Sequence, residues 1–139
     1  MLGVIAAGGA IGATARYALG EAFPVAAGRI PWTTFAINVS GAFVLGVLLT
    51  FVLERWPPTQ YVRPFGAIGV LGAFTTFSTF SVESDVLIKD GHVTTAIAYD
   101  VMSLVAALGA AYLGIVVGRM WPPPERRPYP DYVEDAEDA

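Results

Sequence analysis

Long apolar runs, separated by short polar segments, dominate the pattern of this sequence. One of them, residues 30–53, has no charged residue over its 24 positions. A helix of that length rises about 1.5 Å per residue and measures about 36 Å, enough to cross a hydrocarbon core of about 30 Å. Similar runs lie before and after it. The pattern predicts an all-α membrane protein with four transmembrane helices, at about 2–20, 32–53, 65–88 and 94–118.

Proline, glycine and charged residues mark the segments between these helices. They gather at residues 21–31, 54–64 and 89–93, where proline and glycine end helices for steric reasons. After the fourth helix the chain becomes acidic and rich in proline, without apolar periodicity. We therefore divide the chain into a four-helix transmembrane domain, residues 1–118, and a disordered acidic tail, residues 119–139.

The composition supports a membrane protein and narrows the possible chemistry. Of the 139 residues, 55% are hydrophobic and 14% are charged. A soluble bundle would need a polar face on each helix, and the second and fourth runs have almost none. The chain has no cysteine and one histidine, which excludes disulfides, thiol nucleophiles and a multi-histidine site within one chain. The net charge of -4 comes mostly from the tail, so we expect no nucleic-acid binding. The sequence shows no nucleophile–base pair, phosphate-binding loop or metal cluster, so we expect no enzymatic activity.

The basic residues give the helices no clear orientation. Four spans place both ends of the chain on one side of the membrane. Without the distal arginines of the tail, three basic residues lie toward each side. The positive-inside rule then gives little preference. Two topologies stay open: a single one with the ends inside, and a dual one in which copies insert both ways and pair antiparallel.

The third span carries the most unusual chemistry. Five of the seven residues 75–81 bear hydroxyl groups, and the other two are Phe77 and Phe80. Hydroxyl groups satisfy backbone groups where a membrane helix breaks, and carbonyl oxygens freed by a break suit a hard cation. Phe74, Phe77 and Phe80 are spaced to share one helical face. They form either a packing stripe or a row of ring edges that face a small anion.

Other polar residues within the spans each have two interpretations. Asn38, in the second span, either donates to an anion or forms a hydrogen bond between helices. Arg16, near the end of the first span, either attracts anions or extends to the membrane interface. Tyr99 and Ser103 share a face of the fourth span and continue a polar track. We place Asp100 near the interface, and without an acid deep in the first three spans a proton antiporter is disfavoured.

Three motifs follow one another in the order found in one family. Residues 8–17 are rich in glycine and end in Arg-Tyr, residues 33–43 contain Asn38, and residues 72–80 contain Thr-Thr-Phe-Ser-Thr-Phe, with Glu83 following. In these motifs the sequence resembles the Fluc/CrcB fluoride channels. The resemblance covers the four spans and leaves out the tail.

The resemblance implies a fluoride-selective channel in the cell inner membrane, which passively exports cytoplasmic fluoride and relieves its toxicity. Fluoride would enter the cell as HF, lose its proton in the cytoplasm and leave along the membrane potential. The family architecture is an antiparallel, dual-topology homodimer with two pores, in which each subunit has a broken third helix. The implied pore residues are Asn38, Thr76, Phe77, Thr79, Phe80, Tyr99 and Ser103. Arg16 and Glu83 would line a vestibule. The carbonyls of Gly72 and Thr75 would hold a structural sodium ion.

Three other interpretations compete with this one. A small multidrug-type proton antiporter is also a four-span dual-topology dimer, but it needs a carboxylate in the first span, and this sequence has none there. A structural or assembly subunit would transport nothing. The third alternative is one half of a heterodimeric channel, which a single sequence does not distinguish from a homodimer.

Overall fold

The computed structural model describes residues 1–55 and 61–121 of the chain. The first helices are α1 (Leu2–Ala22) and α2 (Trp32–Thr50), which continues into the π-helical segment η1 (Phe51–Arg55). A second π-helical segment, η2 (Arg63–Leu71), leads into α3 (Gly72–Phe74) and is followed by α4 (Phe77–Lys89). The last helix is α5 (Val93–Met120).

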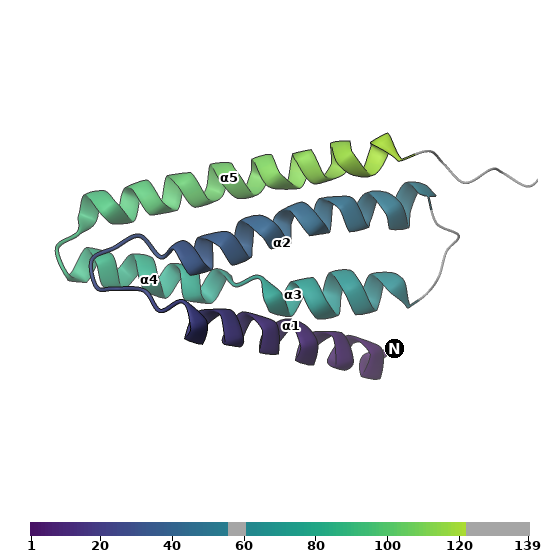
Figure 1. Cartoon of the computed structure of the whole chain (residues 1–139), viewed down its shortest axis with the longest axis horizontal. Helices are drawn as coiled ribbons and strands as arrows, with labels where there is room; N and C mark the ends of the chain where they lie inside the picture. The colour runs from purple at the N-terminus through teal and green to yellow at the C-terminus, as the bar shows by residue number, and fades with distance from the viewer. Residues whose placement is uncertain (56–60, 122–139) are drawn as a thin grey trace, which may run out of the picture.

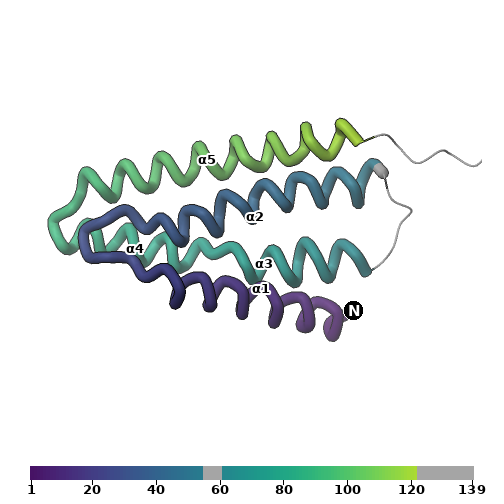
Figure 2. The backbone as a smooth tube through the Cα atoms, viewed as in Figure 1, coloured from purple at the N-terminus to yellow at the C-terminus, as the bar shows by residue number. Residues whose placement is uncertain are grey.

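These elements form an up-and-down bundle in which the long helices lie side by side (Figure 1). The backbone trace shows the same arrangement (Figure 2). Helix α2 packs along α5, and α1 packs along η2 and α3. The connections from α1 to α2 and from α4 to α5 lie at one end, which we call the loop end. The N-terminus and the last turn of α5 lie at the other, the terminal end.

Four helical stretches of the described residues are long and apolar enough to cross a membrane: Leu2–Ala22, Trp32–Glu54, Arg63–Lys89 and Val93–Met120. Each bound lies within two residues of the predicted one, which confirms the all-helical, four-span prediction. Helix α5 continues to Met120, two residues past the predicted end of the transmembrane domain, before the proline run. Residues 122–139, on which the predicted disorder mainly falls, lie outside the described residues.

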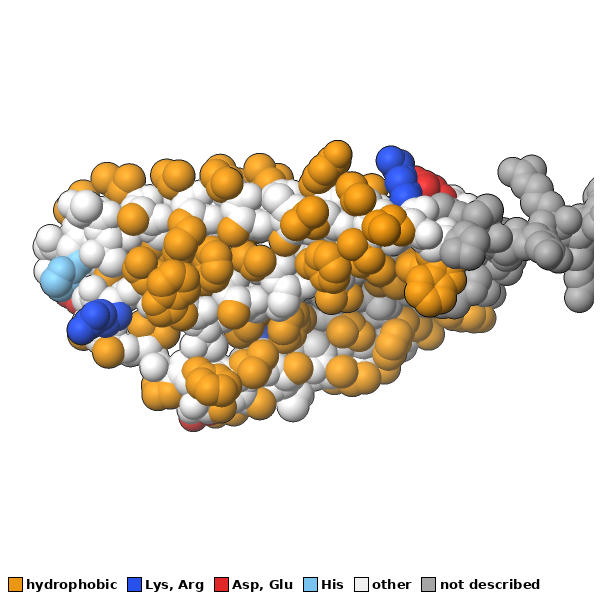
Figure 3. Space-filling model, turned by 45° about the horizontal axis from the view of Figure 1, so that its top comes forward, with side chains coloured by type: hydrophobic (Ala, Val, Ile, Leu, Met, Phe, Trp, Pro, Cys, Tyr) orange, Lys and Arg blue, Asp and Glu red, His pale blue; other side chains and the backbone are white. Residues whose placement is uncertain are grey.

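The outer surface of the bundle is apolar along its length. Hydrophobic side chains cover most of the face in Figure 3, and charged side chains lie toward its two ends. On α5, Leu104 and Leu108 are 63% and 64% exposed, whereas Tyr99 is fully buried. Lipid stabilises such an apolar exterior, which water would penalise. The chain is therefore a multi-pass membrane protein.

Small residues bring the helices close together at several points. A Cβ atom on Gly12 of α1 would collide with the carbonyl oxygen of Val70. Gly46 of α2 and Gly114 of α5 likewise leave room only for the backbone of the facing helix. Such contacts are typical of membrane helices that pack closely through small residues. Gly9 of α1 has open space where its side chain would be, so it does not take part.

Helical geometry stops at Phe74 and resumes at Phe77. Between them Thr75 has a ψ of 152°, and Thr76 has a φ of -146° and a ψ of 118°, which are extended conformations. The spacing of Phe74, Phe77 and Phe80 predicts one shared helical face. That prediction is wrong for Phe74, because the interruption places it on a different helix from the other two.

Candidate functional site

Asn38 of α2 binds the backbone at the interruption between α3 and α4. Its Oδ1 accepts the N–H of Thr76 at 2.8 Å, and its Nδ2 donates to the carbonyl oxygen of Thr76 at 3.0 Å. The side-chain amide thus replaces helical partners that the extended backbone lacks. An amide nitrogen carries two N–H groups, so one remains beyond this pair of bonds. Of the two interpretations given to Asn38, the hydrogen bond between helices is present. The remaining N–H of the amide can still donate to an anion, which is the other interpretation.

Threonine hydroxyls satisfy neighbouring backbone groups. Thr75 Oγ1 donates to the carbonyl oxygen of Leu71 at 2.9 Å. Thr76 Oγ1 accepts the backbone N–H of Thr79 at 3.1 Å, which makes it the N-cap of α4. The same hydroxyl donates to Thr79 Oγ1 at 2.9 Å. Most hydroxyl groups of this segment are therefore already engaged within the protein.

The carbonyl oxygens around the interruption differ in their bonding. That of Ala73 accepts a hydrogen bond from Arg16 Nε at 3.0 Å, and that of Thr76 is held by the amide described above. Among the described residues, no donor bonds to the carbonyl oxygens of Gly72 or Thr75. Carbonyl oxygens without a donor are ligands of the kind that hard cations prefer. These two carbonyls therefore fit the chemistry of a sodium ligand.

Glu83 of α4 joins three helices near the loop end. Its Oε1 accepts the hydroxyl of Thr34 from α2 at 2.8 Å. Its Oε2 accepts the hydroxyl of Tyr99 from α5 at 2.9 Å. Because both carboxylate oxygens are bonded, the side chain is fixed between α2 and α5 rather than free at an interface.

A cavity of about 350 Å³ opens beside this carboxylate, between α1, α2 and α4. Arg16, Thr76, Thr79 and Glu83 are among the residues that line it. The two predicted vestibule residues therefore share one cavity with two predicted pore hydroxyls. The remaining predicted pore residues are not among its lining residues: Asn38, Phe77, Phe80, Tyr99 and Ser103.

The aromatic residues of α4 continue toward α5. The ring centroids of Phe77 and Phe80 are 5.8 Å apart, and those of Phe80 and Tyr99 are 5.1 Å apart. Phe77 is 80% exposed, and other large apolar side chains on the outer surface of the bundle are exposed as well. The three rings form a continuous series from the surface of the chain to the fully buried Tyr99.

Two buried polar atoms of α5 have no hydrogen-bond partner among the residues that the structure describes. Ser84 Oγ donates to Asp100 Oδ2 at 2.9 Å, but Asp100 Oδ1 is buried and unpaired. Ser103 Oγ, one turn further along α5, is also buried and unpaired. Asp100 is predicted near the membrane interface, yet its carboxylate is enclosed by the bundle. Unpaired buried polar atoms cost free energy, so such a place favours a water molecule or an ion.

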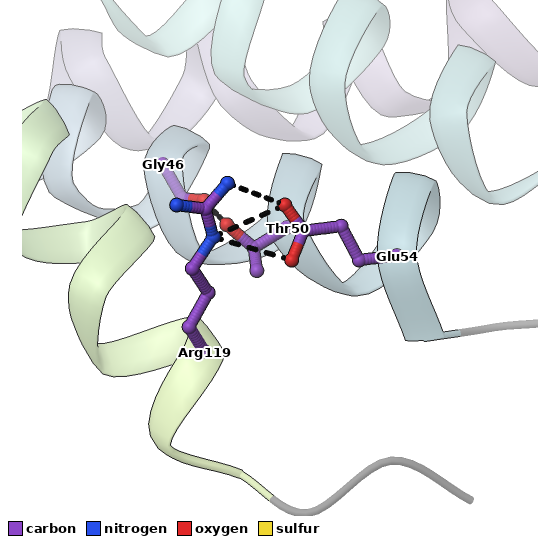
Figure 4. A network of polar contacts seen from close by, with 4 residues as sticks. All are labelled: Gly46, Thr50, Glu54 and Arg119. Carbon is purple, nitrogen blue, oxygen red and sulfur yellow. Dashed lines mark hydrogen bonds and ion pairs between the residues drawn. The ribbon is translucent and has the colours of Figure 1, made fainter.

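A separate ion pair between Arg119 and Glu54 lies at the terminal end (Figure 4). Arg119 donates to Glu54 from Nη2 at 2.7 Å and from Nε at 3.1 and 3.2 Å, which joins α5 to η1. Next to this pair, the hydroxyl of Thr50 donates to the carbonyl oxygen of Gly46 at 2.9 Å. The Arg119 and Glu54 side chains are 61% and 40% exposed, and exposed pairs contribute only about 0–1 kcal/mol.

The sequence analysis did not identify two residues that bond to the acidic side chains of the site, Thr34 with Glu83 and Ser84 with Asp100. Thr34 lies four positions before Asn38, so the two share a face of α2, and this spacing was the available signal. Ser84 follows Glu83 directly, and its bond to Asp100 depends on how α4 packs on α5. No spacing along the chain indicates that contact.

These features define a small multi-pass membrane protein whose helical bundle encloses a polar tract. The family model described as CrcB-like protein, Camphor Resistance (CrcB), matches residues 3–115, and the chain belongs to this family.

The chain is also similar to several proteins named as fluoride-specific ion channels. Fluoride-specific ion channel FluC 3 of Streptomyces avermitilis is 56% identical over 121 residues, which cover 86% of this chain and 59% of that protein. FluC 2 of the same organism is 46% identical over 71% of this chain and 63% of its own length. FluC 2 of Nocardia farcinica is 39% identical over 83% of this chain and 82% of its own length. The chain thus spans about three fifths of the first two relatives.

Proposed function

We propose that the chain forms a fluoride-selective channel that passively exports cytoplasmic fluoride across the cell inner membrane and relieves its toxicity. The observation that carries this proposal is the similarity to fluoride-specific ion channels over most of the four-span region. The membrane potential drives the anion outward, so the mechanism needs neither a nucleotide nor a chemical reaction.

The polar tract supports a pathway that holds the anion weakly. Fluoride loses water when it enters a narrow pore, and the lining must replace that water with donors. Asn38 has one N–H left for this role, and the buried hydroxyl of Ser103 has no other partner. The rings of Phe77 and Phe80 add positively polarised edges. The cavity beside Arg16 is the vestibule of this pathway.

The channel unit in this proposal is an antiparallel dimer of dual topology. The exposed ring of Phe77 supports it, because a second subunit would cover that ring and complete the pore wall. The interruption at Thr75 and Thr76 lies at the middle of the membrane in this arrangement. Light scattering of the purified protein should then give twice the mass of one chain. A partner encoded by a paralogue would give a unit of unequal chains.

A structural sodium ion also belongs to the proposal. The carbonyl oxygens of Gly72 and Thr75, which lack donors, would hold it, and the ion would supply positive charge at the interruption. A ligand that binds only the folded state raises the unfolding temperature with its concentration. We therefore expect the melting temperature in sodium to exceed that in N-methyl-D-glucamine at equal ionic strength. Identical melting curves would contradict the sodium site without contradicting fluoride transport.

Anion efflux from liposomes tests the function directly. Purified protein is reconstituted with internal potassium fluoride or potassium chloride, and valinomycin starts the efflux. Fast release of fluoride without release of chloride is the expected result. Equal release of both ions would refute selectivity. If neither ion is released, the homodimeric channel is refuted, and co-expression with a paralogue tests the heterodimer.

A further inference from the structure

Asp100 is a half-buried acid that the proposed pathway does not use. It lies on α5, between the fully buried Tyr99 and the buried Ser103. One carboxylate oxygen accepts the hydroxyl of Ser84, and the other is buried without a partner. No basic side chain among the described residues forms an ion pair with it. Its negative charge is therefore not compensated by a protein cation within the part of the chain that the structure describes.

Asp100 lies close enough to Ser103 on α5 for its carboxylate to repel an anion bound at the Ser103 hydroxyl. Residues three apart on a helix are neighbours, with Cβ atoms about 5–6 Å apart. Ser103 is 8% exposed, and its hydroxyl has no partner, so it is the donor on this face that is free for an anion. An anion bound there would stand one helical turn from the carboxylate of Asp100. Like charges at this distance repel strongly in a protein of low effective dielectric constant.

We propose that Asp100 sets the fluoride affinity of the anion pathway, because its carboxylate weakens anion binding at the hydroxyl of Ser103. This inference rests on the proposed function. A conducting pore must bind its ion well enough to admit it and weakly enough to release it. The donors of Ser103 and Asn38 attract fluoride, and Asp100 opposes them. Fluoride therefore leaves the site quickly instead of remaining bound.

The charge can be separated from the hydrogen bond. Asp100→Asn removes the negative charge and keeps an oxygen that accepts the hydroxyl of Ser84. Ser84→Ala removes the hydrogen bond and keeps the charge. Asp85→Asn is a matched control, since it removes a neighbouring acid of α4 that is exposed and paired with Lys89 at 2.6 Å. If Asp100→Asn does not fold, Asp100→Ser is the second variant.

Initial rates of fluoride efflux from liposomes, measured over a range of internal fluoride concentrations, test the proposal. We expect Asp100→Asn to lower the half-saturating fluoride concentration about tenfold, with a maximal rate equal to or below that of the unmodified protein. Ser84→Ala and Asp85→Asn should keep the original half-saturating concentration.

Two results would overturn the inference alone. One is an Asp100→Asn curve that superimposes on that of a conducting unmodified protein. The other is an equal shift in Ser84→Ala, which would assign the effect to helix position rather than charge. An unmodified protein that releases no fluoride would refute the homodimeric channel, and this inference for the homodimer with it.

Discussion

Replacement of Asn38 tests whether its amide supports the interruption between α3 and α4. In Asn38→Asp the side chain can still accept the N–H of Thr76, but it places an oxygen opposite the Thr76 carbonyl. That carbonyl loses its donor, and a buried polar group left unsatisfied costs about 1–3 kcal/mol. Asn38→Ala removes both bonds and leaves both groups unpaired, so the expected loss is about 2–6 kcal/mol.

Thermal unfolding of the purified protein in detergent measures this loss. For a chain of this size we expect Asn38→Asp to lower the melting temperature by about 4–12 °C, and Asn38→Ala to lower it further. Both variants should also lose fluoride efflux, because the backbone of Thr76 is no longer held. Ser40→Ala is the matched control on α2, since that hydroxyl donates to carbonyls of its own helix. The reasoning is refuted if Asn38→Asp melts at the same temperature as Ser40→Ala.

Three further predictions follow from single contacts. Phe77→Ile should abolish fluoride efflux, because the proposed pore wall would lose an aromatic ring edge, and retained efflux would remove Phe77 from that wall. Gly114→Ala should destabilise the bundle by about 1–3 kcal/mol, because the added methyl group collides with the backbone of α2. Gly109→Ala, at an open helical position, should stabilise the bundle by up to about 1 kcal/mol. A higher melting temperature for Gly114→Ala than for Gly109→Ala would contradict the packing. Arg119→Gln should change the unfolding free energy by less than about 1 kcal/mol, since its bond to Glu54 is exposed, and a larger loss would show an additional role.

The number and bounds of the spans could be predicted from the sequence because they depend on local composition. A run without charges must be buried in lipid or protein, and its length fixes whether it can cross a membrane. Prolines and glycines then mark the connections. The same local reasoning placed the end of α5 at residue 118. The helix continues to Met120, where the following proline run disfavours further helical geometry.

The bonding of the site could be predicted only in part. The hydroxyl-rich segment pointed to backbone groups that need side-chain partners, and Thr75 and Thr76 supply such bonds. The partner of each group depends on how distant helices pack. Asn38 and Thr76 are 38 residues apart, and Ser84 meets Asp100 across two helices. Periodicity shows which residues share a face, but not which face of another helix they meet.

In the proposed channel, the distribution of engaged and free donors would let this polar tract hold an anion only weakly. Membrane helices need partners for nearly every polar group, and here most hydroxyls bond to the protein itself. Thr34 and Tyr99 donate to Glu83, so their hydroxyl protons are not available to a passing anion. Among the described residues, the free donors include the second N–H of Asn38 and the hydroxyl of Ser103. With so few, a desolvated fluoride ion regains only part of its hydration, and the nearby carboxylates lower its affinity further. That balance favours rapid passage over tight binding.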